Sequence, residues 1–342
     1  MVSLPVLARF DTLAVGVAAG LAAALASAVS YLVSRHHGNR GGGGSLRLLV
    51  QAHVVMGLAS LPLCWWLAPA AWPADRRWLL PLAGSVLTYL GGQAGVFATL
   101  KQMPASRIAP LLGLKLVILA VLVSLQPGAG LTPLQWLAVG MSVTAAVILQ
   151  RGGRGTAAIT VRPLAMLLAT CLSFAVSDLC IVGLIDGLGS SQDASGTAIS
   201  RLHAGGLAMA VTYALCGGLA GLVLACVPAV RPRDGSDRNA ALQYAAAWLG
   251  GMVALYVCFG LVGAVLGNVL QSTRGVMAIV IGAALARAGW HDLEERVDRA
   301  TMLRRVAAAC LMVVAIAVYV TGTTGACSTA AGPPTPKAAG HP

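Results

Sequence analysis

Long apolar stretches, separated by short polar or Gly/Pro-rich pieces, make up most of the sequence. Segments that alternate apolar and polar residues, as the strands of membrane β-barrels do, are absent from it. Stretches of about 20 apolar residues are long enough to cross a bilayer as an α-helix. The pattern predicts an all-α integral membrane protein with ten transmembrane helices, at residues 12–34, 48–68, 78–100, 107–125, 132–150, 163–185, 204–229, 241–262, 264–287 and 303–322.

Composition strengthens this interpretation and sets aside several other classes. Hydrophobic residues make up 58% of the chain and charged residues 10%, less than half of the roughly 25% that is usual in soluble domains. The lipid bilayer is therefore an expected partner, and a multi-pass position in the cell (inner) membrane the expected location. The eight cysteines show no CxxC spacing, which favours packing roles and predicts neither metal nor other cofactor.

The net charge of +12 concerns membrane orientation. Basic residues lie in the predicted loops without forming a basic domain, so no nucleic acid partner is expected. If both termini share one side, 16 of the 23 Lys and Arg residues lie on the opposite side, in 35–47, 101–107, 151–162, 231–238 and 287–305. The positive-inside rule then predicts that the termini lie outside the cytoplasm.

The sequence also repeats itself. LASAVSYL at 25–32 returns as LSFAVSDL at 172–179, and LGGQAGVFATL at 90–100 aligns with LGGMVALYVCF at 249–259. Each half holds five predicted helices, and an odd number inverts the second copy in the membrane. We therefore expect two inverted five-helix repeats. The predicted divisions are an N-terminal segment (1–11), a first repeat (12–150), a connecting loop (151–162), a second repeat (163–322) and a disordered C-terminal tail (323–342).

A family resemblance follows from the first half. The segment PASRIAPLLGLKLVILAVLVSL at 104–125, followed by LTPLQWLAVGMSVTAAVIL at 131–149, resembles the fourth and fifth helices of an EamA-type repeat. That repeat belongs to the drug/metabolite transporter superfamily, whose members commonly carry two five-helix repeats. The resemblance implies this fold over about 12–322. It also implies cytoplasmic termini, the reverse of the orientation that the charges predict.

Three ionisable residues lie inside predicted helices, where charge is costly and usually functional: Lys115, Asp178 and Arg274. The repeat aligns Lys115 with Arg274, each near the middle of its predicted helix. Two cations facing one cavity would attract a phosphate or carboxylate. The arrangement is similar to the sugar-phosphate branch of the superfamily, in which basic residues on the fourth and ninth helices hold the phosphate. Two alternatives remain: Asp178 could neutralise one cation in a structural ion pair, or the cations could snorkel to an interface.

Other polar and aromatic residues fall at helical spacing around these charges. Asn268 and Gln271 share one helix face with Arg274, because they step by three. Tyr89 and Gln93 step by four along the third helix. The candidate substrate-binding set is Lys115, Arg274, Gln271, Asn268, Gln93, Tyr89, Tyr256 and Trp248. For the aromatic members, packing is an equally simple explanation. Asp178 or His53 could couple transport to protons, although His53 is also explained as a buried, hydrogen-bonded ring.

Motifs for catalysis or ATP hydrolysis are missing from the sequence, which has no HExxH, GxSxG or Walker loop. We therefore expect no enzyme. The leading hypothesis is secondary, non-ATP transport of a small, anionic metabolite by alternating access. One alternative is a proton-coupled exporter of amino acids or drugs. Another, of a different class, is a non-transporting membrane partner or a lipid-handling protein. The sequence indicates no oligomeric state.

Overall fold

The computed structural model describes residues 4–39, 45–100, 112–127, 130–150, 161–287 and 299–330. Within these ranges the regular structure is helical, apart from two isolated β-bridges. The elements are α1 (Leu4–Asn39), α2 (Ser45–Trp66), η1 (Arg76–Trp78), α3 (Leu79–Leu100), α5 (Leu114–Ser124), α6 (Pro133–Gln150), α7 (Val161–Leu188), α8 (Arg201–Cys226), η2 (Pro228–Val230), α9 (Gly235–Ser272), α10 (Arg274–Arg287) and α11 (Arg299–Ala330). The all-α prediction is thus confirmed for the described residues.

Five described segments are long and apolar enough to cross a membrane: Asp11–Ser34, Leu46–Trp66, Val161–Leu188, Arg201–Cys226 and Gly235–Ala278. Three shorter apolar helices are Leu114–Ser124, Pro133–Ile148 and Val306–Gly322. By length and composition, these five segments are candidate membrane spans. The division into ten spans stays a prediction, in part because the predicted span 107–125 begins outside the described residues.

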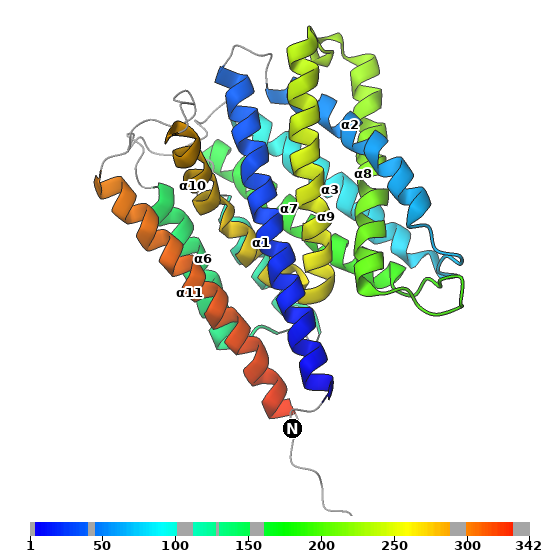
Figure 1. Ribbon diagram of the computed structural model, residues 1–342, viewed down its shortest axis with the longest axis vertical. Helices are drawn as coiled ribbons and strands as arrows, with labels where there is room; N and C mark the ends of the chain where they lie inside the picture. The colour runs from blue at the N-terminus through cyan, green and yellow to red at the C-terminus, as the bar shows by residue number, and fades with distance from the viewer. Residues whose placement is uncertain are drawn as a thin grey trace, which may run out of the picture.

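The helices pack in pairs drawn from the two halves of the chain (Figure 1). Helix α1 lies along α9, α2 along α8, α3 along α7 and α6 along α11. Helix α9 also contacts α2, α5, α7 and α8, which places it at the centre of the bundle. The start of α1 and the end of α11 lie at the same end of the molecule (Figure 1), as expected when a chain crosses a membrane an even number of times.

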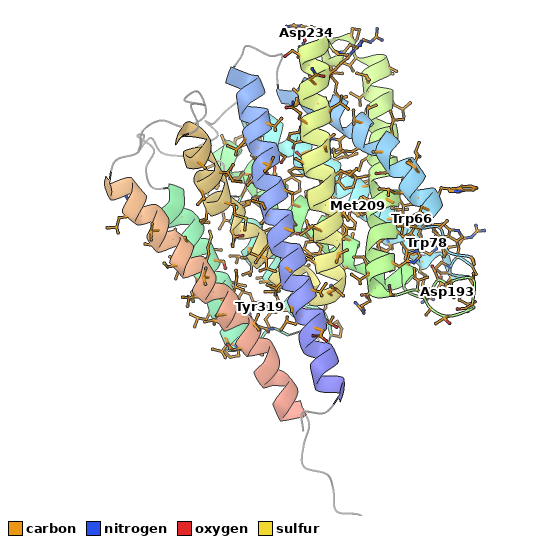
Figure 2. The ribbon with its side chains drawn as sticks, viewed as in Figure 1. Trp66, Trp78, Asp193, Met209, Asp234 and Tyr319 are labelled. Carbon is orange, nitrogen blue, oxygen red and sulfur yellow. The ribbon has the colours of Figure 1, made fainter. Side chains whose placement is uncertain are left out.

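Tryptophans gather at one end of the bundle. Trp65 and Trp66 at the end of α2 are 87% and 78% exposed, and the rings of Trp72 and Trp78 stack with their centroids 5.4 Å apart. Figure 2 shows Trp66 and Trp78 at the end that also carries Asp193, whereas Asp234 lies at the opposite end. Exposed tryptophans are typical of the membrane–water interface, so this end of the bundle meets the lipid headgroups.

Two helices extend beyond the spans that the sequence predicts. Helix α11 continues to Ala330, past position 323, where a disordered tail was expected to begin. Helix α1 begins at Leu4, inside the expected N-terminal segment. Pro5 lies in the first turn of α1, where proline is tolerated, and the end of α11 contains no proline.

Gly263 turns the chain back on itself within α9. Its φ of 81° lies in the left-handed region that residues with a Cβ avoid. Gly20 of α1 packs against both Cys258 and Leu270, so the segments on either side of Gly263 run side by side. A second interruption follows at Thr273, which separates α9 from α10. The sequence had predicted one unbroken span at 264–287.

The connection between α8 and α9 forms hydrogen bonds and an ion pair with the start of α2. The Arg47 guanidinium lies 3.4 Å from the Asp237 carboxylate and donates hydrogen bonds to the Ala229 carbonyl. The Gln51 side chain donates to the Val230 carbonyl at 3.0 Å. These bonds satisfy carbonyl groups at η2 that no helix hydrogen bond reaches, so they hold α2 and α8 together at this end.

Further along, α2 and α8 touch backbone to backbone at Gly57 and Gly217. A methyl group on Gly217 would meet the Gly57 Cα and lie 2.8 Å from the His53 carbonyl oxygen. Gly218 is the matched control, because a methyl group there meets nothing within 4 Å. We expect Gly217→Ala to lower the free energy of unfolding by about 1–3 kcal/mol through overpacking, and Gly218→Ala to change it little. Thermal unfolding in detergent measures both, and equal stability of the two variants would contradict the close packing.

Candidate functional site

An ion pair inside the bundle joins α5 to α7. The Lys115 Nζ lies 2.7 Å from the Asp178 Oδ2, with the Lys115 side chain 24% exposed and the Asp178 side chain 8% exposed. The same carboxylate oxygen accepts a hydrogen bond of 2.6 Å from the Asn268 amide of α9. Lys115 also lies 5.7 Å from the centre of the Phe174 ring. Asp178 is thereby held by both a cation and an amide donor, which offsets the cost of burying its charge.

Arg274, at the start of α10, has a different environment. Its guanidinium carbon lies 5.5 Å from the centre of the Tyr31 ring on α1, a cation–π contact. Among the described residues no carboxylate pairs with it. The Tyr31 ring is 45% exposed and meets the Trp248 ring edge-on, with centroids 6.1 Å apart. Arg274 thus keeps a charge that an aromatic face stabilises but does not neutralise.

Aromatic contacts connect these two cations across the bundle. The Trp248 indole donates a hydrogen bond of 3.0 Å to the Tyr213 hydroxyl of α8. The Tyr213 ring lies 6.1 Å from Tyr89 on α3, and Tyr89 lies 6.4 Å from Phe174, the ring beside Lys115. The aromatic bridge, defined as Tyr31, Trp248, Tyr213, Tyr89 and Phe174, therefore joins Arg274 to Lys115 through five helices.

His53 of α2 lies against the middle of this aromatic bridge. Its Nδ1 lies 2.8 Å from the Leu49 carbonyl and its Nε2 lies 2.9 Å from the Tyr89 hydroxyl. Because a carbonyl oxygen only accepts, Nδ1 carries a proton, and in the neutral ring Nε2 accepts the Tyr89 hydroxyl hydrogen. His53 stacks on Tyr213 at 6.3 Å. Both of its nitrogens are engaged, so it orients Tyr89.

Tyr31 and Asp178 occupy the same position of the repeated octapeptide. In the structure each stands against the cation of a helix in the other half of the chain: Asp178 against Lys115, and Tyr31 against Arg274. Lys115 and Arg274 are themselves aligned by the repeat. Two equivalent contacts thus carry different chemistry, an ion pair in one half and a cation–π contact in the other.

Both cations stand where a helix begins. Lys115 lies in the first turn of α5, which starts at Leu114, and Arg274 is the first residue of α10. The sequence had placed each cation near the middle of a helix. This placement is wrong for the described residues, because turns at Leu112–Gly113 and Thr273 interrupt the chain just before them.

The other predicted site residues lie around this cluster. Gln271 is 7% exposed and lies one turn beyond Asn268. Gln93 is half-buried, one turn along α3 from Tyr89. Tyr256 is 2% exposed, and its backbone packs on Gly205 of α8. Contacts in the structure join Lys115, Asp178 and Asn268 directly, and link Arg274, Trp248, Tyr89 and His53 through rings.

Sequence reasoning missed Tyr213 and Phe174, which complete the aromatic bridge. Tyr213 is the one aromatic residue of α8, a helix otherwise made mostly of small and aliphatic residues. Phe174 lies inside the repeated octapeptide, one turn before Asp178. Either position could have been recognised by asking which large side chain interrupts a run of small ones. Among the described residues, no group of His, Cys, Asp and Glu is arranged to hold a metal ion.

Comparison with known proteins identifies the first half of the chain. Residues 14–151 match the model of the EamA-like transporter family. This segment is similar to an EamA domain. The match supports, for residues 14–151, the resemblance to the drug/metabolite transporter superfamily seen in the sequence.

The whole fold also resembles a solved protein. One crystal structure superposes on this protein with a TM-score of 0.66 over 89% of this chain and 95% of that chain, at 15% sequence identity. At this identity the likeness extends to the fold alone. Comparison with curated proteins gives no match.

A double-mutant cycle tests whether the Lys115–Asp178 pair stabilises the fold. Removing one partner leaves the other charge unpaired, which costs about 3–5 kcal/mol for a fully buried pair and less here because Lys115 is partly exposed. We expect Asp178→Asn and Lys115→Gln each to lower the unfolding temperature in detergent, and the double variant to be more stable than the sum of the single effects implies. The control is Asp186→Asn, which breaks the exposed Arg201–Asp186 pair and should cost at most about 1 kcal/mol. Strict additivity of the two buried substitutions would show that the pair contributes nothing.

Proposed function

We propose that this protein is a secondary transporter of the inner membrane that carries a small organic anion by alternating access, and that Arg274 binds the anionic group. The observation that carries this proposal is the difference between the two cations. Lys115 is neutralised by Asp178, whereas Arg274 pairs with no carboxylate of the described residues. A cation within membrane-spanning helices needs a counter-ion, and an anionic substrate supplies one.

The chemistry around Arg274 suits a transported ligand. A guanidinium binds carboxylate or phosphate through two parallel hydrogen bonds. The contact with the Tyr31 ring engages the face of the guanidinium and leaves the N–H groups at its edge available. With Lys115 and Asp178 cancelling, the cluster keeps one net positive charge, which attracts an anion.

Helix pairing supports two inverted five-helix repeats. Helix α1 begins the first predicted repeat and packs on α9, while α7 begins the second and packs on α3. The two pairs are equivalent if the repeats are related by a two-fold axis, since α3 and the first part of α9 carry the aligned LGG segments. Helices α2 with α8, and α6 with α11, would then pair across the axis itself. Such symmetry underlies alternating access in many transporters, whose binding sites lie between the repeats at interrupted helices.

Transport in proteoliposomes tests the role of Arg274. A panel of radiolabelled carboxylate and phosphate metabolites would be offered to the parent protein and to Arg274→Gln. We expect the uptake of any transported anion to fall at least about tenfold in the variant, since the loss of one charged hydrogen bond accounts for about that factor. Its unfolding temperature should stay near that of the parent protein. Arg76→Gln, on the exposed η1, is the control. Normal uptake by Arg274→Gln would refute the anion site.

We further propose that the loop charges set the orientation, with both termini outside the cytoplasm. A single cysteine placed near Pro342 in a cysteine-free background reports the side of the C-terminus. We expect an impermeant thiol reagent to label it in intact cells. Labelling after cell breakage alone would reverse the assignment and favour the cytoplasmic termini that the family implies.

A further inference from the structure

Gln271 is a buried side chain with an unused hydrogen-bonding atom. The residue is 7% exposed, and its Oε1 has no hydrogen-bond partner in the described structure. Buried polar atoms are almost always paired, and leaving one unpaired costs free energy. A glutamine that serves packing alone would be replaced without loss by leucine or methionine. The unused oxygen therefore needs a hydrogen-bond partner that the described residues do not supply.

Gln271 lies in sequence between two residues of the cluster, Asn268 and Arg274. It follows Asn268 by three residues on α9, and residues three apart share a helix face. Asn268 donates to Asp178 at 2.6 Å, so this face is the one turned toward the Lys115–Asp178 pair. Arg274 follows three residues later, after the interruption at Thr273. Along the chain, Gln271 thus lies between Asn268, which contacts the ion pair, and Arg274, the cation without a counter-ion.

We infer that Gln271 Oε1 accepts a hydrogen bond from a hydroxyl group of the transported anion; the inference rests on the proposed function. The anionic group of the substrate binds Arg274, and a hydroxyl carried by the same molecule reaches Gln271 one turn earlier. An ammonium donor fits less well, because the same molecule's anionic group binds the Arg274 cation and like charges repel. The substrate class is therefore a small hydroxy acid or a hydroxyalkyl phosphate.

This arrangement lets the site distinguish anions that carry a hydroxyl group from anions that lack one. A buried acceptor that is paired by the correct substrate stays unpaired with an analogue lacking the hydroxyl, so the analogue binds more weakly. The empty protein meanwhile carries an unpaired polar group, which lowers its own stability. A specificity residue of this kind consequently differs from a structural one in a measurable way: its apolar replacement weakens selection and does not weaken the fold.

The experiment compares the parent protein with Gln271→Met, a replacement of similar length and volume. Binding to the purified protein is measured by thermal shift with three pairs of anions that differ in one hydroxyl: lactate and propionate, malate and succinate, and glycerol 3-phosphate and propyl phosphate. We expect the hydroxylated member of at least one pair to bind the parent protein about tenfold more tightly, and this ratio to fall toward one in Gln271→Met. The empty variant should unfold at the same temperature as the parent protein or higher.

Gln51→Met is the matched control, because Gln51 is equally buried but donates to the Val230 carbonyl. It should lower the unfolding temperature and leave the ratio within each pair unchanged. A hydroxyl preference that survives in Gln271→Met would overturn the role of Gln271 and leave the transport proposal intact. A fall in the unfolding temperature of Gln271→Met to that of Gln51→Met would show that Oε1 has a structural partner, which also overturns it. Binding of none of the six anions to the parent protein would overturn the anion site and this inference together.

Discussion

A charge inside a membrane-spanning bundle must be neutralised or solvated, and this constraint shapes the centre of the protein. The charge of Lys115 is neutralised by Asp178, which also accepts a hydrogen bond from Asn268. The charge of Arg274 is only partly stabilised, by the face of the Tyr31 ring. An aromatic face offsets some of the cost of burying a cation, but it brings no negative charge. The unequal treatment of two equivalent cations is the feature on which the proposed transport rests.

The sequence repeat explains how this inequality arises. The repeat places one cation on α5 and one on α10. It also places one residue on α1 and one on α7 that each contact one of these cations. A single difference at the facing position, Tyr31 in one copy and Asp178 in the other, produces an ion pair on one side and an aromatic contact on the other. A perfectly symmetric site would hold two equal charges. The observed site holds one net charge, and the aromatic bridge keeps the two ends of the site in contact.

Much of this organisation could be predicted from the sequence because it depends on local patterns. Apolar length predicted the helices, and the aligned octapeptides singled out Tyr31 and Asp178 as the place where the halves differ. Which cation Asp178 would join could not be predicted, since the choice depends on how α5 and α7 pack. Tyr213 was missed because nothing local marks a tyrosine on α8 as the ring between Trp248 and Tyr89. The interruption at Thr273 was missed because threonine is compatible with an apolar helix.

The central claim is that a positive charge at position 274, without a protein counter-ion, attracts the transported anion. Chemical restoration of that charge tests it most directly. In a cysteine-free background, Arg274→Cys would be treated with a thiol reagent that attaches an ammonium group, or with one of similar size that attaches a sulfonate, and anion uptake into proteoliposomes would then be measured. The account predicts an inactive cysteine variant that regains uptake with the ammonium group and not with the sulfonate. Equal uptake after both treatments would contradict it.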